Sequence, residues 1–379
     1  MINVFQPMLG EAELAAVKEV FESNWIGKGR RVEQFERAFA DHIGVGAEHV
    51  TSVNSCTEAT FIAMQVLGLG PGDDVVLPTV SFVSAANAVA AHGARPVFCD
   101  VAERTLNPGV ADIEAALTPA TKAVLVLHFG GYPGEIAAIA ELCRRRGIHL
   151  IEDAANAVAS RVDGQACGTF GDIGVWSFDH GKIAVAVDGG MFYARDAELA
   201  ERAAKLAYLG LEHFTGFSQA EKSANRWWEI EVSSFSRRSV MNDVLAAIGG
   251  VQLGRLPEFL RRRQAVVDYY NHELAGIDGL ELPPPLPAGH EGSHYFYWVR
   301  VGEGLRDAVA RDLYERGVYT TFRYPLLHKV AIYGADRPLP GAEQAAARTL
   351  CLPLHQALSD TDLKTVVTAL RESIAGRAR

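Results

Sequence analysis

Lys182 stands in an unusually apolar stretch of the chain, which makes it a first candidate for chemistry. It follows a short apolar run that ends at Ser177, and residues 183–187 lead from it, all apolar, to the double glycine 189–190. Apolar surroundings favour the uncharged amine of a lysine, and a free amine is a nucleophile toward carbonyl carbons. Taken alone, a solvated lysine on a loop between two strands fits the same pattern. Other polar groups must decide between the two interpretations.

Asp153 closes another apolar run, and a carboxylate there is costly unless a cation pairs with it. The nitrogen of a protonated pyridine ring would be such a cation, and the ion pair would keep that ring a strong electron sink. A helix cap or a metal ligand would also explain the residue. No cluster of histidines and cysteines accompanies it, so we predict no metal site.

A turn suited to a phosphate group precedes both residues. Residues 54–60, Asn-Ser-Cys-Thr-Glu-Ala-Thr, follow an apolar run and open a helical stretch. The N–H groups of a helix N-terminus, with the hydroxyls of Ser55 and Thr57, form an anion site, although a plain helix cap explains them equally well. A phosphate turn, Asp153 and Lys182 in this order are what a pyridoxal phosphate enzyme needs. The combination is far more specific than any one of the three.

The elements that must position these groups alternate between strand and helix. Short apolar runs predict seven strands, at residues 50–53, 74–77, 96–99, 123–127, 148–151, 173–177 and 191–194. Helical stretches lie between most of the early runs, which predicts an α/β fold with a mostly parallel sheet flanked by helices. Ligands on such sheets bind at the carboxyl ends of the strands, where Ser55 and Asp153 fall.

The pattern becomes helical near Asn242 and changes again after a proline-rich break at 282–287. A long helix is predicted over 243–263, continuing toward Tyr270. Beyond the break we expect a smaller α/β module, with helices at 305–316 and 361–374 and strands at 295–301 and 318–322. The expected organisation is a large domain at 1–255, including the N-terminal helical segment, and a small C-terminal domain at 256–379.

The amino-acid composition limits which binding partners and which cellular location we expect for the protein. The 379 residues are 49% hydrophobic and 22% charged, as in an ordinary globular protein. A formal net charge of −10 disfavours nucleic acid or an anionic membrane as the main partner. The five scattered cysteines form no CxxC pair, no apolar run is long enough to span a membrane, and the start lacks a signal-peptide pattern. We expect a cytoplasmic protein that binds neither nucleic acid nor membrane.

Further motifs extend along nearly the whole chain: Phe35-Glu36, Pro-Thr-Val-Ser-Phe at 78–82, Leu-Thr-Pro-Ala-Thr-Lys at 117–122, His-Phe-Gly-Gly at 128–131, Glu-Asp-Ala-Ala at 152–155, Ser177-Phe178 and Gln252-Leu253. With them the chain resembles the DegT/DnrJ/EryC1/StrS family of sugar aminotransferases, within the fold-type I aspartate aminotransferase superfamily. The resemblance implies a fold-type I architecture, with a mostly parallel seven-stranded sheet in the large domain. It also implies a homodimer with active sites at the subunit interface.

The resemblance implies a role for each candidate residue. Lys182 would bind pyridoxal 5′-phosphate covalently and then move the proton between substrate carbon and cofactor. Asp153 would pair with the pyridinium nitrogen, and Phe82 would stack on the ring. Asn156 stands where a Gln or His usually approaches the phenolic oxygen of the cofactor. The phosphate would be held by Ser55, Cys56, Thr57 and Ser177.

Three stretches depart from the family pattern. Cys56 stands where a glycine is more usual, and Ala-Val-Ala at 184–186 replaces a more polar, threonine-containing run. Within Ser-Arg-Arg-Ser-Val-Met-Asn-Asp at 236–243, Arg238 occupies the place of an asparagine that crosses the dimer interface to the partner's cofactor phosphate. An arginine could serve there through charge-assisted hydrogen bonds, or it could mark an altered acceptor pocket.

The resulting hypothesis is a pyridoxal phosphate-dependent aminotransferase of amino-sugar biosynthesis. It would take an amino group from L-glutamate, carry it as pyridoxamine phosphate, and deliver it to a keto-sugar, with a nucleotide-linked keto-deoxyhexose favoured. Transfer to a cyclitol ketone is one alternative, and a cofactor-binding regulatory protein without turnover is another. Packing or solvation explains equally well the five candidate substrate contacts, which are Trp25, Lys28, Arg323, Tyr324 and His328.

Overall fold

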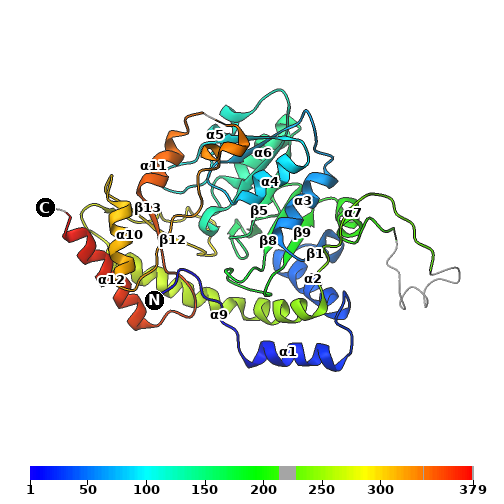
Figure 1. The fold of residues 1–379 in the computed structure, drawn as a ribbon, viewed down its shortest axis with the longest axis horizontal. Coiled ribbons are helices and arrows are strands. Elements are labelled where there is room, and N and C mark those ends of the chain that lie inside the picture. The colour runs from blue at the N-terminus through cyan, green and yellow to red at the C-terminus, as the bar shows by residue number, and fades with distance from the viewer. Residues whose placement is uncertain (213–227, 336, 378–379) are drawn as a thin grey trace.

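The computed structural model describes residues 1–212, 228–335 and 337–377, and its centre is a seven-stranded sheet (Figure 1). The strands lie in the order β1-β9-β8-β5-β4-β2-β3. Strand β9 is antiparallel to both of its neighbours, and the other neighbours are parallel. The bounds are β1 (Val50–Val53), β2 (Asp74–Pro78), β3 (Arg95–Cys99), β4 (Thr121–Leu127), β5 (His149–Asp153), β8 (Ile173–Ser177) and β9 (Gly190–Ala194). The predicted seven-stranded, mostly parallel α/β architecture is confirmed.

Helices flank this sheet and continue into the C-terminal part of the chain (Figure 1). Helix α3 packs against α4 and α7, and α5 packs against α6. The helices are α1 (Glu11–Glu22), α2 (Arg30–Ile43), α3 (Cys56–Val66), α4 (Val83–Ala91), α5 (Val110–Ala116), α6 (Ile136–Arg146), α7 (Ala197–Ala207), α9 (Asp243–Leu274), α10 (Arg306–Glu315), α11 (Pro340–Arg348) and α12 (Asp360–Ala375). Short 3₁₀ turns are η1 (Ala47–His49), η2 (Phe129–Gly131), η3 (Leu327–Lys329) and η4 (Ala331–Tyr333).

Four strands of the large sheet are buried along their whole length. Every residue of β1, β2, β8 and β9 is buried, which explains why the sequences of these strands show no alternation of apolar and charged residues. Because β1 is antiparallel to β9, and β9 to β8, β1 runs in the same direction as β8. The carboxyl ends of β1, β8, β5, β4 and β2 therefore meet at one edge of the sheet.

A smaller antiparallel sheet organises the C-terminal part. Its strands are β10 (Leu280–Glu281), β12 (Tyr297–Val301) and β13 (Thr349–Leu352), in that order. The prediction of a strand at 318–322 was wrong: Val318 and Thr321 form only isolated bridges, to Ile2 and Cys351, and β13 takes the place beside β12. A third sheet joins β11 (His290–Glu291), β6 (Arg161–Val162) and β7 (Gln165–Ala166).

Two hydrophobic cores meet along the 32-residue helix α9. Phe259 belongs to the core around the large sheet, whereas Val266, two turns later, belongs to the core around the small sheet. Between them lies Arg263, a buried arginine that is bound to loops of the C-terminal part. The expected domain limits of 1–255 and 256–379 stay a prediction.

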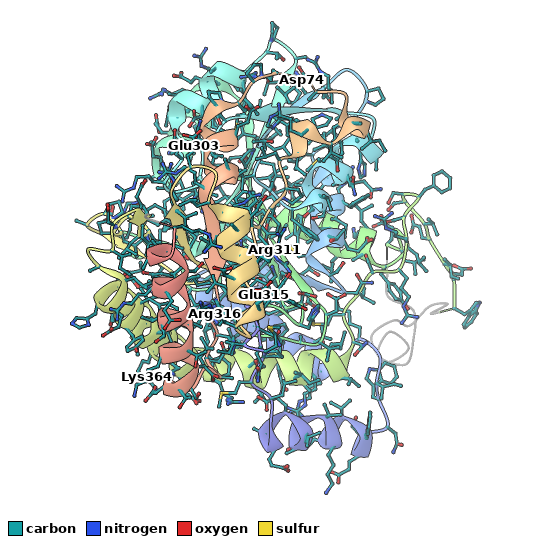
Figure 2. The ribbon with its side chains drawn as sticks, turned by 60° about the vertical axis from the view of Figure 1, so that its left-hand side comes forward. Asp74, Glu303, Arg311, Glu315, Arg316 and Lys364 are labelled. Carbon is teal, nitrogen blue, oxygen red and sulfur yellow. The ribbon has the colours of Figure 1, made fainter. Side chains whose placement is uncertain are left out.

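The outer face of the smaller module is strongly charged. Figure 2 shows α10 and α12 side by side, with Arg311, Glu315, Arg316 and Lys364 labelled along them. Arg316 forms an ion pair with Glu372 across these helices. In the described parts of the chain no helix is both long and apolar enough to cross a membrane, and no group of three or more His, Cys, Asp or Glu is arranged to hold a metal ion.

Candidate active site

The turn after β1 opens α3 at the carboxyl edge of the sheet. Ser55 caps the helix, because its Oγ accepts a hydrogen bond from the N–H of Glu58 at 3.2 Å. The first N–H groups of an α-helix have no acceptor within the helix, so they can bind an anion. Gly190 of β9 lies against this turn, and a Cβ there would come within 2.5 Å of the Ser55 carbonyl carbon. Glycine at 190 therefore allows the turn to pack tightly on the sheet.

Cys56, Thr57 and Ser177 lie near the same turn. Ser177 ends β8 and pairs in register with Gly190, which pairs on its other side with β1. Burial raises the pKa of the Cys56 thiol well above its usual value, the charge of Asp153 raises it further, and Lys182 opposes the shift. The thiol is therefore neutral, and it lies within electrostatic reach of both charged groups.

Lys182 lies on the loop between β8 and β9, close to an amide and an aromatic ring. Its Nζ donates to Oδ1 of Asn156 at 3.5 Å. The same nitrogen lies 4.9 Å from the centre of the Tyr295 ring, a position in which a cation is attracted to the ring face. These two contacts keep the amine at the carboxyl edge of the sheet.

The loop that carries Lys182 is fixed by two glutamine side chains. Residues 183–186 are at most 2% exposed. Oε1 of Gln252, on α9, accepts from the N–H of Val185 at 3.3 Å. Nε2 of Gln356 donates to the carbonyl oxygen of Ile183 at 3.2 Å. The apolar run after the lysine thus buries its backbone, and the two amides satisfy the polar groups that burial would leave unpaired.

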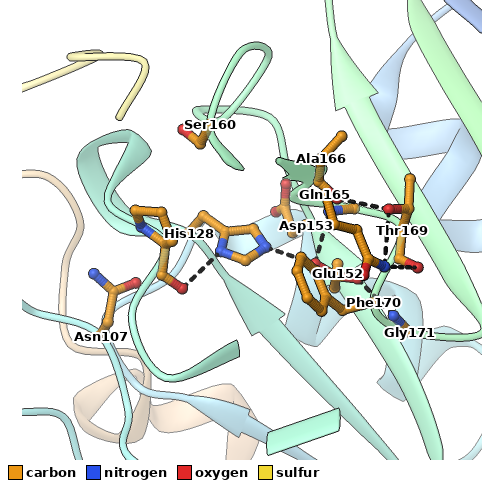
Figure 3. Close-up of polar contacts among 12 residues, drawn as sticks. Asn107, His128, Glu152, Asp153, Ser160, Gln165, Ala166, Thr169, Phe170 and Gly171 are labelled. Atoms are coloured by element: carbon orange, nitrogen blue, oxygen red, sulfur yellow. Dashed lines mark hydrogen bonds and ion pairs between the residues drawn. The ribbon is translucent and has the colours of Figure 1, made fainter. Parts of the chain in front are cut away.

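Glu152 and Asp153 end β5 and point to opposite faces of the sheet, as successive residues of a strand do. Figure 3 shows the polar contacts around Glu152, whose side chain is fully buried. Its Oε2 accepts from Nε2 of His128 at 2.9 Å and from the N–H of Gly168 at 2.6 Å. Its Oε1 accepts from the N–H of Gly171 at 2.6 Å. Both oxygens of Glu152 are therefore satisfied within the protein.

Asp153 is buried with much less support. The N–H of Ala155 donates to its Oδ1 at 3.0 Å, and within the described residues no other hydrogen bond reaches this carboxylate. Burial raises the pKa of Asp153, and the Ala155 N–H, Lys182 and His128 offset only part of the rise. A cationic atom of a ligand beside this carboxylate would relieve the cost of burying it.

Asn156 has an unused donor next to the lysine. The residue is 1% exposed, and its Oδ1 is the acceptor for Lys182. Its Nδ2 has no hydrogen-bond partner in the described chain. Buried donors are rarely left unpaired, so an acceptor on a ligand, or the phenol of the nearby Tyr324, is expected there. A helix N-terminus for a phosphate, an underpaired carboxylate for a ring nitrogen, an amide donor and a lysine together fit pyridoxal phosphate.

Phe82 and Tyr324 form an aromatic wall beside these groups. Phe82 follows β2 at the start of α4 and is 46% exposed, whereas Tyr324 is buried. The two rings meet edge to face with their centres 5.7 Å apart. Burial raises the pKa of the Tyr324 phenol, and Lys182 opposes this shift, which indicates that the two residues lie near each other.

The other candidate substrate contacts are Trp25, Lys28 and Arg323, each of which contacts a neighbouring side chain or backbone group. Trp25 is 54% exposed, and its Nε1 donates to the carbonyl oxygen of Lys28 at 3.1 Å. Nζ of Lys28 lies 3.7 Å from Oε1 of Glu36. The guanidinium carbon of Arg323 lies 4.8 Å from the centre of the Phe5 ring. In the described residues no carboxylate forms an ion pair with Arg323.

His328 and Arg238 are placed differently from the rest. The His328 side chain has no exposed surface and is bound to Thr79 and Glu343. Arg238 is exposed, with its guanidinium carbon 5.7 Å from the centre of the Tyr208 ring. No hydrogen bond or ion pair joins either residue to Lys182 within the described chain. A role for Arg238 in a second subunit stays a prediction.

Sequence reasoning missed Tyr295 and Gln356, which contact Lys182 and its loop. Tyr295 belongs to the aromatic run Tyr-Phe-Tyr-Trp at 295–298, which marks a buried strand but gives no sign of a partner more than a hundred positions away. Gln356 follows the buried strand β13, which was also missed. A glutamine beside a buried strand is a signal that could have been followed, since buried amides need partners.

Comparison with known proteins places these observations in a family. Residues 7–371 match the model of the DegT/DnrJ/EryC1/StrS aminotransferase family. The chain is 58% identical over 374 residues to dTDP-4-dehydro-2,3,6-trideoxy-D-glucose 4-aminotransferase of Saccharopolyspora spinosa, covering 99% of this chain and 97% of the relative. It is 34% identical to GDP-perosamine synthase of Caulobacter vibrioides, over 97% of each chain. The crystal structure of the aminotransferase TlmJ from Streptoalloteichus hindustanus superposes with a TM-score of 0.96 at 61% identity, over the whole of both chains.

Proposed function

The chain belongs to the DegT/DnrJ/EryC1/StrS aminotransferase family, and we propose that it transfers the amino group of L-glutamate to C4 of a nucleotide-linked 4-keto-2,3,6-trideoxyhexose. The protein is an aminotransferase that acts on a sugar. The proposal for the sugar rests on the 58% identity, over nearly full length, to a 4-aminotransferase whose substrate is of that kind. L-glutamate is proposed as the amino donor from the family resemblance.

The proposed cofactor is pyridoxal 5′-phosphate. When bound, it supplies an aldehyde that reacts with amines and an electron-withdrawing ring that stabilises negative charge on the substrate carbon. Its fit is supported by the underpaired carboxylate of Asp153 and the unused Nδ2 of Asn156. The exposed ring of Phe82 is suited to stack on the cofactor. The proposed phosphate ligands are the N-terminus of α3 with Ser55, Cys56, Thr57 and Ser177.

Lys182 is the proposed catalytic residue. Its amine would bind the cofactor, leave it when an amino substrate arrives, and then carry the proton between substrate carbon and cofactor. The Asn156 amide and the Tyr295 ring, at 3.5 Å and 4.9 Å, would hold the released amine in reach of the reacting carbon. Asp153 would keep the ring nitrogen protonated throughout.

A homodimer is proposed because the segment before α9 leaves large apolar side chains in solvent. Phe235 is 97% exposed, and Trp228, Ile230 and Val232 are each more than half exposed. Large apolar side chains exposed along one segment favour burial against another protein surface. A second copy would cover them and would bring Arg238, close to this segment, toward the partner's phosphate site.

The proposed acceptor contacts are Trp25, Lys28, Arg323 and Tyr324. Arg323 is suited to an anionic group because it lies on Phe5, which stacks on Tyr295 beneath Lys182. A nucleotide diphosphate or a donor carboxylate is the chemistry that a guanidinium recognises. Trp25 offers an exposed ring that could lie against a nucleobase or sugar.

The test is a panel of acceptors with L-glutamate and cofactor, assayed for 2-oxoglutarate. The panel contains nucleotide-linked 4-keto-2,3,6-trideoxyhexose, a nucleotide-linked 4-keto-6-deoxyhexose and a cyclitol ketone, and a parallel arm replaces L-glutamate by L-glutamine. We expect the fastest turnover with the trideoxy sugar and glutamate. Lys182→Ala should lose both turnover and the visible absorbance of the bound cofactor. Turnover with the cyclitol ketone alone would contradict the proposal.

A further inference from the structure

His328 is the buried centre of a series of hydrogen bonds that joins the smaller module to the large sheet. Its side chain has no exposed surface, and both ring nitrogens have partners. Nδ1 lies 2.6 Å from Oγ1 of Thr79, and Nε2 lies 3.2 Å from Oε1 of Glu343. Thr79 follows β2 directly, and Glu343 stands in the first turn of α11. Thr79 lies 249 positions before His328 in the sequence, whereas Glu343 lies 15 positions after it.

The donors and acceptors of this series can be assigned from its geometry. Oγ1 of Thr79 accepts the backbone N–H of His328 at 3.1 Å, so its own proton is free to go to Nδ1. Nδ1 is then the acceptor, and Nε2 carries the hydrogen that it donates to the Glu343 carboxylate. A neutral imidazole in one tautomer satisfies every contact, and the ring is thereby held in a single orientation.

Glu343 remains charged at the outer end of the series. Lys329 lies 2.8 Å from it, and this ammonium and then His328 lower the pKa of Glu343 to about 2. The Glu343 carboxylate therefore stays charged and accepts the hydrogen bond from Nε2 of His328 throughout the neutral pH range. The series of hydrogen bonds does not depend on a titration near neutral pH.

Backbone contacts run beside these side chains. The N–H of Leu327 donates to the carbonyl oxygen of Thr79 at 2.9 Å, and Val80 and Leu326 form an antiparallel bridge. Phe82 follows Val80 by two residues, and Tyr324 precedes Leu326 by two residues. The bridge therefore lies two residues from each ring of the aromatic wall. The clasp of Thr79, His328 and Glu343 therefore fixes the two loops that carry the aromatic wall.

We propose that His328 is a positioning residue, which acts through Thr79 and Glu343 to hold Phe82 and Tyr324 at the distance that the cofactor ring requires. The two rings meet edge to face at 5.7 Å, and Phe82 offers its remaining face to a ligand. Because its nitrogens are both engaged and buried, His328 does not touch a substrate.

The test compares His328→Leu, Thr79→Val and Glu343→Gln for cofactor binding to the cofactor-free protein. Loss of a buried hydrogen bond should raise the dissociation constant for pyridoxal phosphate about three- to tenfold for His328→Leu and Thr79→Val, and less for Glu343→Gln. The visible circular dichroism per bound cofactor, which reports the orientation of its ring, should fall in the same order. His328→Asn keeps an acceptor for Thr79 and should recover part of both signals.

A matched control is His149→Leu, which removes another histidine from a carboxylate pair, 3.5 Å from Asp172 at the amino end of β5. It should leave cofactor affinity and circular dichroism unchanged. The inference is wrong if His328→Leu lowers only the melting temperature, or if Thr79→Val matches the parent protein in both measurements. Should His328→Leu fail to fold, Thr79→Val, which keeps the side-chain shape, decides alone.

This inference rests on the proposed cofactor but not on the proposed sugar. A parent protein that does not bind pyridoxal phosphate would overturn the proposed function itself. A parent protein that binds it, with variants that bind it equally well, would overturn only the role of His328.

Discussion

Two regions meet at the end of β5, one around Glu152 and the other around Asp153. Glu152 accepts hydrogen bonds from His128, Gly168 and Gly171 at 2.6 to 2.9 Å, so both of its oxygens are satisfied by the protein. Asp153, the next residue, accepts one N–H hydrogen bond and has a pKa raised by burial. The two carboxylates are equally hidden, and they differ in what the protein supplies to them.

The difference separates a carboxylate that serves the fold from one that serves a ligand. The Glu152 region is complete in the protein alone, so its contribution belongs to folding stability. The Asp153 region is not complete in the protein alone, because a buried anion needs a cation beside it and the protein supplies one hydrogen bond only. Burial alone would not have distinguished the two residues, whereas a count of their hydrogen bonds does.

The largest expected effect comes from Asp153→Asn. The variant loses the charge that would hold the ring nitrogen protonated, so turnover should fall on the order of 10³-fold. In the cofactor-free protein the same change removes a poorly paired buried anion, and the free energy of unfolding should rise by roughly 1 kcal/mol. Turnover assays check the first expectation, and urea denaturation of the cofactor-free protein checks the second. If Asp153→Asn instead lowers the free energy of unfolding of the cofactor-free protein, Asp153 serves the fold as Glu152 does, and the proposed difference between the two residues is wrong.

The opposite pattern is expected for Glu152→Gln. An amide carries hydrogens where His128, Gly168 and Gly171 present theirs, so the free energy of unfolding should fall by about 3 kcal/mol. The effect should be the same with and without cofactor, as urea denaturation of both forms would measure. Glu22→Gln, on an exposed ion pair with Lys18, is the control and should change stability by less than about 0.5 kcal/mol. An effect of Glu152→Gln confined to cofactor binding would contradict the assignment.

The smallest expected effect is a pH dependence of the cofactor-free protein. Burial raises the folded-state pKa of Asp153 above its ordinary value, so below that ordinary value the carboxyl group is neutral in both states and costs no stability. The cost grows as pH rises toward the folded-state pKa and is constant above it. The stability difference between Asp153→Asn and the parent should therefore be near zero at about pH 4 and larger at pH 8. Thermal unfolding of both proteins across this range measures it, and a flat difference would contradict the raised pKa.

The sequence predicted most of the large sheet and the groups at its carboxyl edge. Most residues of its strands are buried, so most strands read as short apolar runs, and helices separate most of them. Asp153 ends one strand, and the Ser55 turn and Lys182 follow the ends of two others within five residues, which is why the fold brings them to one edge. Their closeness therefore followed from the strand pattern.

The C-terminal module was harder to predict. The residues 318–322, Val-Tyr-Thr-Thr-Phe, have strong strand propensity, yet they form only isolated bridges. The four residues of β13 form a run too short for its period to be recognised. Tyr295 and the burial of His328 depend on how this module packs on the large sheet, and tertiary packing leaves no local pattern in the sequence.

Helix α9 makes the two hydrophobic cores one cooperative unit. It is about 48 Å long at 1.5 Å per residue, and it passes from one core to the other between Phe259 and Val266. Arg263, at this passage, donates to Gln356, which in turn holds the loop of Lys182. Heating should therefore give a single calorimetric transition in which the catalytic loop and both cores melt together, and neither half should survive a cut within this helix.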